Sequence, residues 1–275
     1  MTIFETLVLS GGSVKGLCTL GALQYVAELQ PLPSFKKFFG TSIGAVIALL
    51  ICVDCTPIEI VYVFSQFKFH LDFKFSSQEI QIIDYAHILD TIGSMVALKT
   101  GARAADCTFR ALRKRGKSLH CIAYNYSRDR VEIFSHKTTP DMSCLDAIKL
   151  SCALPYLFGR CIHDADLYFD GGLVSNFPID VAIRHKARNI LGIVLHTRST
   201  HSVNDSCVAQ FFHLIFTPIN HRTEQLIKKY AGKHTIVKID SYIPITKFQL
   251  SLDEIMRNFL EGYRACKVRL TPLLL

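Results

Sequence analysis

The first fifty residues alternate between strand-like and helix-like segments, and this order restricts the fold more than any other feature of the sequence. Hydrophobic periodicity predicts strand, helix, strand and helix in turn, over Thr6–Ser10, Gly16–Leu29, Phe35–Phe39 and Ile43–Val53. The same reading predicts later strands at His120–Tyr126, Val131–Ser135, Leu167–Phe169, Ile190–Leu195 and Thr235–Ile239, and helices at Ser143–Ala153, Phe177–His185, Val208–Tyr230 and Ser251–Leu270. Such alternation predicts an α/β fold with a mainly parallel central sheet and helices on both faces. No repeat or linker interrupts it, so we expect a single domain over residues 1–275.

Gly40-Thr41-Ser42-Ile43-Gly44 is a GxSxG sequence at one of these strand-to-helix turns. In this context the serine hydroxyl stands at the tip of a sharp turn. The glycines are needed because a side chain at either place would crowd the turn, and the helix N-terminus behind Ser42 favours developing negative charge. The pattern indicates a nucleophile at Ser42, and a plain glycine-rich turn is the structural alternative.

A serine hydroxyl is a weak nucleophile until a base accepts its proton. Asp170 is the best candidate for this base, because it closes the apolar run Leu167–Phe169 and precedes two glycines. That position is the carboxyl end of a strand, the edge at which α/β sheets place their sites. Asp-Gly-Gly alone is also a common turn signal, and it is the Ser42 turn that favours a catalytic aspartate.

The segment Ser10–Gly16, with the sequence SGGSVKG, lies where the first strand leads into the first helix. Its backbone N–H groups are suited to the oxyanion of an acyl transfer. A phosphate loop fits poorly, because Leu17 breaks the GxxxxGK[ST] pattern and Ser13 breaks GxGxxG. Lys15 could bring positive charge to an oxyanion or a lipid phosphate, or could lie in solvent.

In this order, the three segments resemble the patatin-like phospholipase family, which has a glycine-rich oxyanion loop, a GxSxG turn and an Asp-Gly-Gly sequence that supplies the aspartate of a Ser-Asp dyad. Ser151–Phe158 is similar to the family's alanine-proline segment, and Asp170–Pro178 to its extended Asp-Gly-Gly box. The resemblance covers about residues 5–195.

The resemblance implies a modified α/β-hydrolase fold and calcium-independent cleavage of fatty acyl esters in phospholipids or neutral lipids, with no cofactor and no catalytic histidine. Ser42 would attack the carbonyl, and Asp170 would take its proton and later activate water to release the fatty acid. The oxyanion would be held by the backbone amides of Gly11, Gly12, Ser13 and Ile43.

Ser13 departs from the family pattern, which usually has a third glycine at this place. If the position requires a positive φ, serine costs steric energy and can misdirect an amide. Loss of one oxyanion donor typically slows a reaction by about 10² to 10³, so slow or narrow activity is one expected consequence.

The ten cysteines and eleven histidines form no recognisable metal or disulfide pattern. Cys52-Val-Asp-Cys55 is a lone CxxC without a second pair, and HExxH is absent, so we expect free buried thiols and no metal. The first ten residues lack the basic region of a signal peptide, and the longest apolar run, Ile43–Val53, is shorter than the roughly 20 residues that span a membrane. We expect a cytoplasmic protein that can associate peripherally with intracellular membranes.

The formal net charge of +8 favours an anionic partner, either nucleic acid or a phospholipid surface. Because no nucleic-acid motif is present, we expect lipid and no nucleic acid. The basic cluster Arg110–Lys117 is interpreted as the solvated end of a helix, and the basic helix Ser251–Leu270 is expected to pack on the domain. The aromatic segment Tyr62–Phe75 suits an acyl pocket, a lid or ordinary core.

Two other functions remain open. A His-dependent serine esterase would complete a triad with His163, His185 or His196. A non-catalytic basic lipid-binding protein would keep the fold and bind liposomes without needing Ser42.

Overall fold

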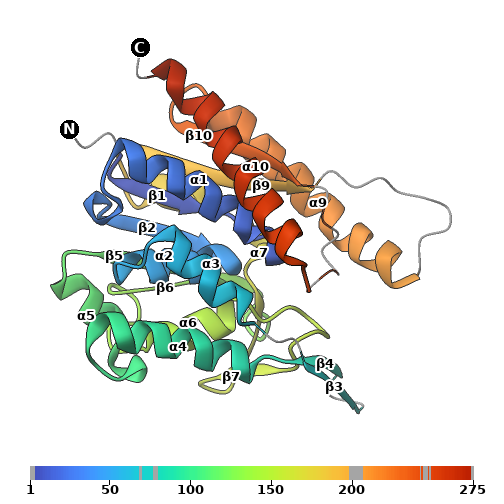
Figure 1. Ribbon diagram of the computed structural model, residues 1–275. Coiled ribbons are helices and arrows are strands. Elements are labelled where there is room, and N and C mark those ends of the chain that lie inside the picture. The colour runs from blue at the N-terminus through green and yellow to red at the C-terminus, as the bar shows by residue number, and fades with distance from the viewer. Residues whose placement is uncertain are drawn as a thin grey trace.

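A mixed sheet forms the centre of the molecule. The computed structural model describes residues 4–67, 70–76, 80–197, 207–241, 243, 247 and 249–273. The central strands are β1 (Thr6–Leu9), β2 (Lys37–Thr41), β5 (Ser118–Asn125), β6 (Arg130–Ser135), β7 (Cys161–His163), β8 (Asp166–Asp170), β9 (Ile190–Thr197) and β10 (Thr235–Ser241). They follow the order β10-β9-β1-β2-β5-β8-β7, with β6 also paired to β5 (Figure 1). The first five in that order are parallel, whereas β6, β7 and β8 run antiparallel to their neighbours.

Helices cover both faces of this sheet. They are α1 (Gly16–Leu29), α2 (Ile43–Cys52), α3 (Pro57–Ser65), α4 (Ala86–Thr100), α5 (Phe109–Lys114), α6 (Cys144–Ser151), α7 (Gly172–Ser175), α8 (Ile179–Arg184), α9 (Cys207–Tyr230) and α10 (Leu252–Leu270). Alternation along β1 turns Leu7 and Leu9 toward the core under α1 and α2, and Val8 toward the smaller core under α8 and α9. The predicted α/β class is therefore confirmed.

Several boundaries differ from the sequence prediction. β2 begins two residues later than predicted and continues through Thr41, so that Ser42 follows the strand directly. The predicted helix Phe177–His185 is present as α8, which is shorter and begins after Pro178, a residue that cannot donate a helical N–H. The short helix α7 precedes it and had not been predicted. The helices α3 and α4 and the hairpin of β3 (His70–Phe75) and β4 (Ile80–Asp84) had not been predicted.

The last helix packs on the domain, as expected, and its main contact there is with α1. Ser251 and Glu254 form the predicted capping box at its start, and Phe259 and Cys266 are buried. A Cβ on Gly21 of α1 would lie 1.8 Å from the Phe259 carbonyl oxygen, and a Cβ on Gly262 of α10 would lie 1.7 Å from that of Cys18. The two backbones can approach this closely only because both positions are glycine.

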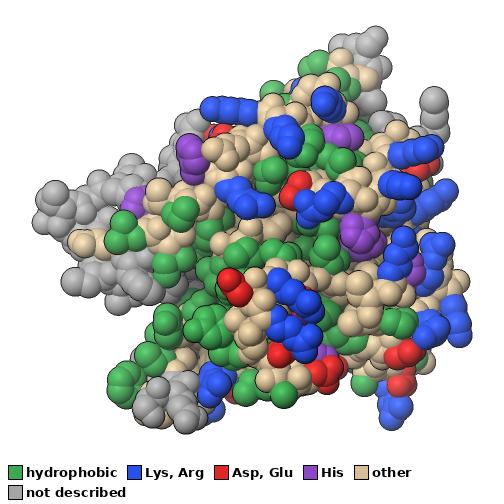
Figure 2. All heavy atoms as spheres, turned by 180° about the vertical axis from the view of Figure 1, so that it is seen from behind, with side chains coloured by type: hydrophobic (Ala, Val, Ile, Leu, Met, Phe, Trp, Pro, Cys, Tyr) green, Lys and Arg blue, Asp and Glu red, His purple; other side chains and the backbone are tan. Residues whose placement is uncertain are grey.

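The remaining sequence expectations concern cysteines and charge. The nine cysteines whose side chains are described are buried and form no disulfide with one another, Cys52 and Cys55 included. The cluster Arg110–Lys117 does contain the end of a helix, α5, although Lys117 is buried there and donates to the carbonyl oxygens of Pro33 and Phe35. Figure 2 shows Lys and Arg side chains gathered toward the right-hand edge of the rear view. Among the described residues, no helix is both long and apolar enough to cross a membrane.

Candidate active site

The sheet register brings Ser42 and Asp170 together. Thr41, the last residue of β2, is paired with Ile122 on β5. Asp170, the last residue of β8, is paired with Ala123, the next residue of β5. Because β2 runs parallel to β5 and β8 runs antiparallel to it, the carboxyl ends of β2 and β8 lie on either side of β5 at the same level. The two candidate catalytic residues therefore meet although 128 positions separate them in sequence.

Ser42 occupies a strained turn between β2 and α2. Its φ of 55° and ψ of −130° place a non-glycine residue in a region that costs about 1–3 kcal/mol. The neighbouring backbone permits this turn only with small residues: a Cβ on Gly40 would lie 2.5 Å from the Gly44 carbonyl oxygen, and one on Gly44 2.6 Å from that of Leu9. The GxSxG glycines thus serve close backbone approach, as predicted for a nucleophile turn.

The Ser42 hydroxyl donates a hydrogen bond to Asp170 Oδ2 at 2.6 Å. Asp170 Oδ1 accepts the Gly172 N–H, also at 2.6 Å, which fixes the orientation of the carboxylate. Burial raises the pKa of Asp170 to about 6, while the hydrogen bonds from Ser42 and Gly172 act in the opposite direction. A carboxylate with this pKa is ionised near neutral pH and is basic enough to accept a proton from a reacting hydroxyl.

Ser151, at the end of α6, supports the turn from beneath. Its hydroxyl accepts the Ser42 N–H at 2.9 Å and donates to the Ile122 carbonyl at 2.6 Å. Two residues after Ser151, the Ala153 carbonyl accepts the Asp170 N–H at 2.8 Å, so the same segment also contacts the candidate base. The Ser151–Phe158 segment is recognisable in the sequence, but no local sequence signal indicates the contact between Ser151 and Ser42.

The predicted oxyanion donors divide into two groups. The Gly11 N–H donates to the Asn176 carbonyl at 3.1 Å, so the structure corrects its predicted role as an oxyanion donor. Gly11 provides space instead, because a Cβ there would lie 2.6 Å from Asn176 Oδ1. The amides of Gly12, Ser13 and Ile43 donate to no acceptor in the described part of the chain.

Ser13 has a φ of 54°, in the left-handed region that glycine adopts without strain. The position therefore has the positive φ for which the family pattern uses glycine. Serine is tolerated here, and the loop continues as a short 3₁₀ helix over Ser13–Lys15 that leads into α1.

Lys15 is buried and does not lie in solvent. It lines a small polar pocket of about 30 Å³ together with Ser42, Asp170 and Asn176. Burial lowers the pKa of Lys15 to about 8, although the neighbouring Cys18 raises it. The pocket is large enough for one water molecule. Asn176, whose side chain lies against Gly11 and Gly172, belongs to this pocket and had not been singled out as a site residue.

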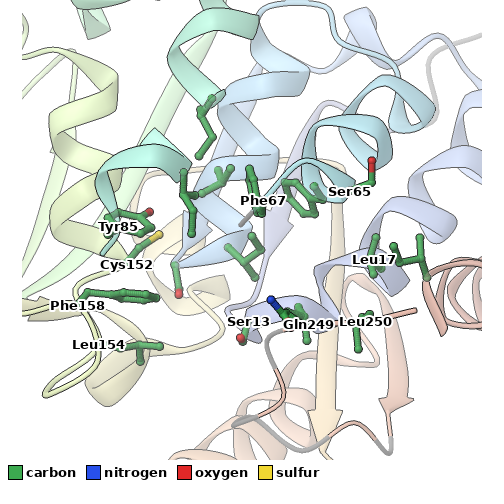
Figure 3. A pocket seen from close by; sticks show the side chains of 18 residues that line it. Ser13, Leu17, Ser65, Phe67, Tyr85, Cys152, Leu154, Phe158, Gln249 and Leu250 are labelled. Atoms are coloured by element: carbon green, nitrogen blue, oxygen red, sulfur yellow. The ribbon is translucent and has the colours of Figure 1, made fainter. Parts of the chain in front are cut away.

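On its other side Ser42 opens into an apolar cavity of about 300 Å³. Figure 3 shows the cavity between Tyr85, Cys152 and Phe158 on one wall, and Leu17, Gln249 and Leu250 on another. The remaining lining residues are Ser13, Val14, Ile43, Val46, Phe64, Ser65, Phe67, Ile88, Ile92, Leu154 and Ile255. Its size and apolar lining suit a hydrocarbon chain.

The aromatic segment Tyr62–Phe75 contributes to this cavity only in part. Phe64 and Phe67 line it and pack on each other with ring centroids 5.0 Å apart. Tyr62 and Phe75 are exposed, whereas Phe69 and the side chain of Phe73 lie outside the described residues.

The three histidines proposed for a triad have other neighbours. His196 contacts Asp240 and Glu224, with N–O distances of 3.1 and 3.4 Å, and His163 lies beside Asp164. His185 packs edge-on against Phe39, and burial together with nearby cations, including Lys37, lowers its pKa. No described histidine lines either cavity beside Ser42. Nor do the described residues gather three metal-binding side chains at one place.

Comparisons with known sequences place this geometry in context. A family model described as patatin-like phospholipase matches residues 7–183. Probable lipid hydrolase 463L of Invertebrate iridescent virus 6 is 33% identical over 195 residues, which are 68% of this chain and 66% of that protein. The uncharacterized protein R571 of Acanthamoeba polyphaga mimivirus is 24% identical over 293 residues, covering 98% of this chain and 95% of its own length.

Solved structures share the fold at low sequence identity. VipD from Legionella pneumophila aligns with a TM-score of 0.61 and 15% identity, over 99% of this chain and 67% of VipD. ExoU, in the ExoU-SpcU complex from Pseudomonas aeruginosa, aligns with a TM-score of 0.54 and 14% identity, over 98% of this chain and 51% of that chain. The chain thus spans about half of the ExoU chain and two thirds of VipD.

Proposed function

Because the chain belongs to the patatin-like phospholipase family, we propose that it is a lipid acyl hydrolase that releases fatty acids from phospholipids or neutral lipids. The observation that carries this proposal is the 2.6 Å hydrogen bond from Ser42 to the buried Asp170, located where an apolar cavity meets a small polar pocket. Nucleophile, base and acyl site are then present in one place.

In the first half of the reaction, the acyl chain occupies the apolar cavity and its ester carbonyl lies beside Ser42. Asp170 accepts the hydroxyl proton as Ser42 Oγ attacks the carbonyl carbon. The amides of Gly12, Ser13 and Ile43 stabilise the resulting oxyanion, and α2 adds the positive end of its dipole. When the ester bond breaks, Asp170 returns the proton to the departing alcohol and an acyl-enzyme remains.

In the second half, a water molecule in the small polar pocket attacks the acyl carbon. Asp170 accepts a proton from this water, and the same three amides hold the second oxyanion. Collapse of the intermediate releases the fatty acid, while Asp170 returns the proton to Ser42 Oγ. One carboxylate thus serves both steps, which is why it needs contact with Ser42 and with the water pocket.

We also propose that the reaction is independent of calcium. Amide N–H groups and the buried Lys15 provide the positive field that the oxyanion needs. Lys15 lines the pocket that would hold the attacking water, and its ammonium is charged below its pKa of about 8.

The test is the release of free fatty acid from mixed phospholipid vesicles in the presence of a calcium chelator. We expect release by the unmodified chain, and a loss of about 10³-fold or more in Ser42→Ala and in Asp170→Asn while both variants stay folded. Equal release by all three proteins would contradict the dyad. Vesicle binding without release by any of them would favour a non-catalytic lipid-binding protein.

A further inference from the structure

Exposed apolar side chains lie on two helices beside the acyl cavity. On α10, Leu252, Met256 and Leu260 are exposed at successive intervals of four residues, so they form one stripe along the helix. On α3, Ile58 and Tyr62 are exposed with the same spacing. We call these five side chains the apolar rim.

The rim is continuous with the cavity mouth. Phe64 and Ser65, two and three residues after Tyr62 at the end of α3, line the cavity. Leu250 and Ile255 line it on either side of Leu252. Both helices contact α1, and Figure 1 shows all three on the same side of the sheet. An acyl chain that enters the cavity between α3 and α10 therefore passes the apolar rim.

The stripe on α10 is distinct from the face with which that helix packs on the domain. Phe259, Gly262 and Cys266 are buried against α1, whereas Leu252 is 72% exposed and Met256 48%. Exposed Arg257, Arg264 and Lys267 accompany the stripe, and exposed Asp253 and Glu261 partly balance their charge. An exposed apolar stripe bordered by basic residues is typical of a helix that lies in a membrane interface.

We propose that the apolar rim inserts into a phospholipid surface, so that an acyl chain moves from the bilayer into the cavity without crossing water. This inference rests on the proposed function for its purpose, and on the exposed side chains for its geometry. Insertion is driven mainly by apolar transfer, with basic residues on α10 and the net charge of +8 favouring anionic lipid. Tyr62, with an apolar ring and a polar hydroxyl, suits the lipid–water boundary.

The experiment compares two triple variants with matched exposure. The rim variant carries Tyr62→Ser, Leu252→Ser and Met256→Ser, at side chains that are 65%, 72% and 48% exposed. The control carries Leu98→Ser, Ile162→Ser and Val268→Ser, at side chains that are 75%, 58% and 76% exposed. None of the six lines the cavity, so both variants should fold and keep the catalytic groups in place.

Binding is measured by flotation with vesicles of equal parts phosphatidylcholine and phosphatidylserine. All proteins carry Ser42→Ala, so that hydrolysis does not change the vesicles and the result does not depend on catalysis. We expect the rim variant to bind about tenfold more weakly or worse, because three apolar side chains no longer leave water, and the control to bind like the parent. Equal binding of the two variants, or no binding by the parent, would overturn the proposal.

A second readout keeps Ser42 and compares two substrates. The rim variant should hydrolyse a water-soluble short-chain ester at the parent rate and lose activity on vesicles. Equal loss on both substrates would instead indicate damage to the site and would contradict a docking role. If the parent hydrolyses neither substrate, the proposed function fails while flotation still decides the docking surface.

Discussion

At the scale of single residues, the site depends on one buried carboxylate. Asp170 contacts Ser42 directly, and its two oxygens accept from the Ser42 hydroxyl and the Gly172 amide. Desolvation makes this carboxylate a stronger base than an exposed aspartate, because burial destabilises the charged form more than the neutral one. In the proposed mechanism, this direct contact takes the place of an imidazole between the two residues.

The pH dependence follows from Asp170 and Lys15. Asp170 acts as a base only when ionised, so kcat/KM for a soluble ester should fall about tenfold per pH unit below its pKa of about 6. Lys15 loses its charge above its pKa of about 8, so a second decline is expected there. The pH–rate profile of Lys15→Met should keep the acid limb and lose the alkaline one. An unchanged alkaline limb in this variant would show that Lys15 does not cause the decline in rate at high pH.

Ser13 provides a prediction about strain. Serine at a φ of 54° costs roughly 1–2 kcal/mol relative to the relaxed backbone, and glycine does not incur this cost. Ser13→Gly should therefore raise the free energy of unfolding in urea by about 1 kcal/mol, with kcat equal or higher. The control is Ser94→Gly on the exposed side of α4, which should lower the free energy of unfolding by roughly 0.5–1 kcal/mol. A lower free energy of unfolding in both variants would show that Ser13 is not strained.

At the scale of elements, α4 contributes one wall of the apolar cavity beside Ser42. Tyr85 precedes the helix and lines the cavity together with Cys152 and Ser42 (Figure 3). Ile88 and Ile92 line the cavity one and two turns further along α4. Ile92 thus lies about 10 Å beyond Tyr85 along the helix axis, and we expect it to limit the length of acyl chain that the cavity accepts.

We predict that Ile92→Ala shifts the chain-length preference toward longer acyl groups and that Ile88→Phe shifts it toward shorter ones. The ratio of kcat/KM for long and short chains should change by about tenfold, the effect of one or two methylene groups in an apolar pocket. This ratio is measured by chromatography of the fatty acids released from a mixture of long-chain and short-chain substrates. Leu89→Ala, on the same helix and outside the cavity lining, should leave the ratio unchanged. If Leu89→Ala changed the ratio by the same amount, Ile88 and Ile92 would not be the residues that select acyl chain length.

The elements that the sequence predicts well are those with strong local signals. α1 and α2 have long apolar patterns that end in recognisable turns, and the α10 capping box marks its start. The hairpin β3–β4 and α4 carry weaker periodicity and were missed. In the site, the Ser42 and Asp170 turns are visible because local glycines accompany them. The role of Ser151 was not visible, because it is a contact across 109 residues that only the folded chain creates.

At the scale of the whole molecule, the last helix closes the fold on the first. The carbonyl oxygens of Phe259 and Cys18 lie where Cβ atoms would be if Gly21 and Gly262 were any other residue. This contact places the start of α10, and with it Leu250 and Ile255, beside the cavity. The C-terminal part therefore completes the site although the family match ends at residue 183.

Replacing Gly262 tests this packing. Alanine favours a helix over glycine by about 1 kcal/mol, yet Gly262→Ala should destabilise the protein by about 1–3 kcal/mol because backbone atoms occupy the space of its Cβ. Gly93→Ala in α4 is the matched control. Its Cβ would meet only Leu145 Cδ1 at 3.2 Å and Ala104 Cβ at 3.4 Å, so it should be neutral or stabilising. Urea unfolding measures the free energy of unfolding of both variants. If Gly262→Ala were more stable than the unmodified chain, the close contact between α1 and α10 would be refuted.

Covalent labelling of Ser42 distinguishes activation by Asp170 alone from activation through a histidine. A long-chain alkyl fluorophosphonate is added to the unmodified chain, to Asp170→Asn, and to variants with glutamine at His163, His185 or His196, and the modified peptide is identified by mass spectrometry. We expect rapid labelling at Ser42, loss of labelling in Asp170→Asn, and unchanged labelling rates in the three histidine variants. Labelling at another residue, or a histidine variant that abolishes it while Asp170→Asn does not, would contradict the dyad.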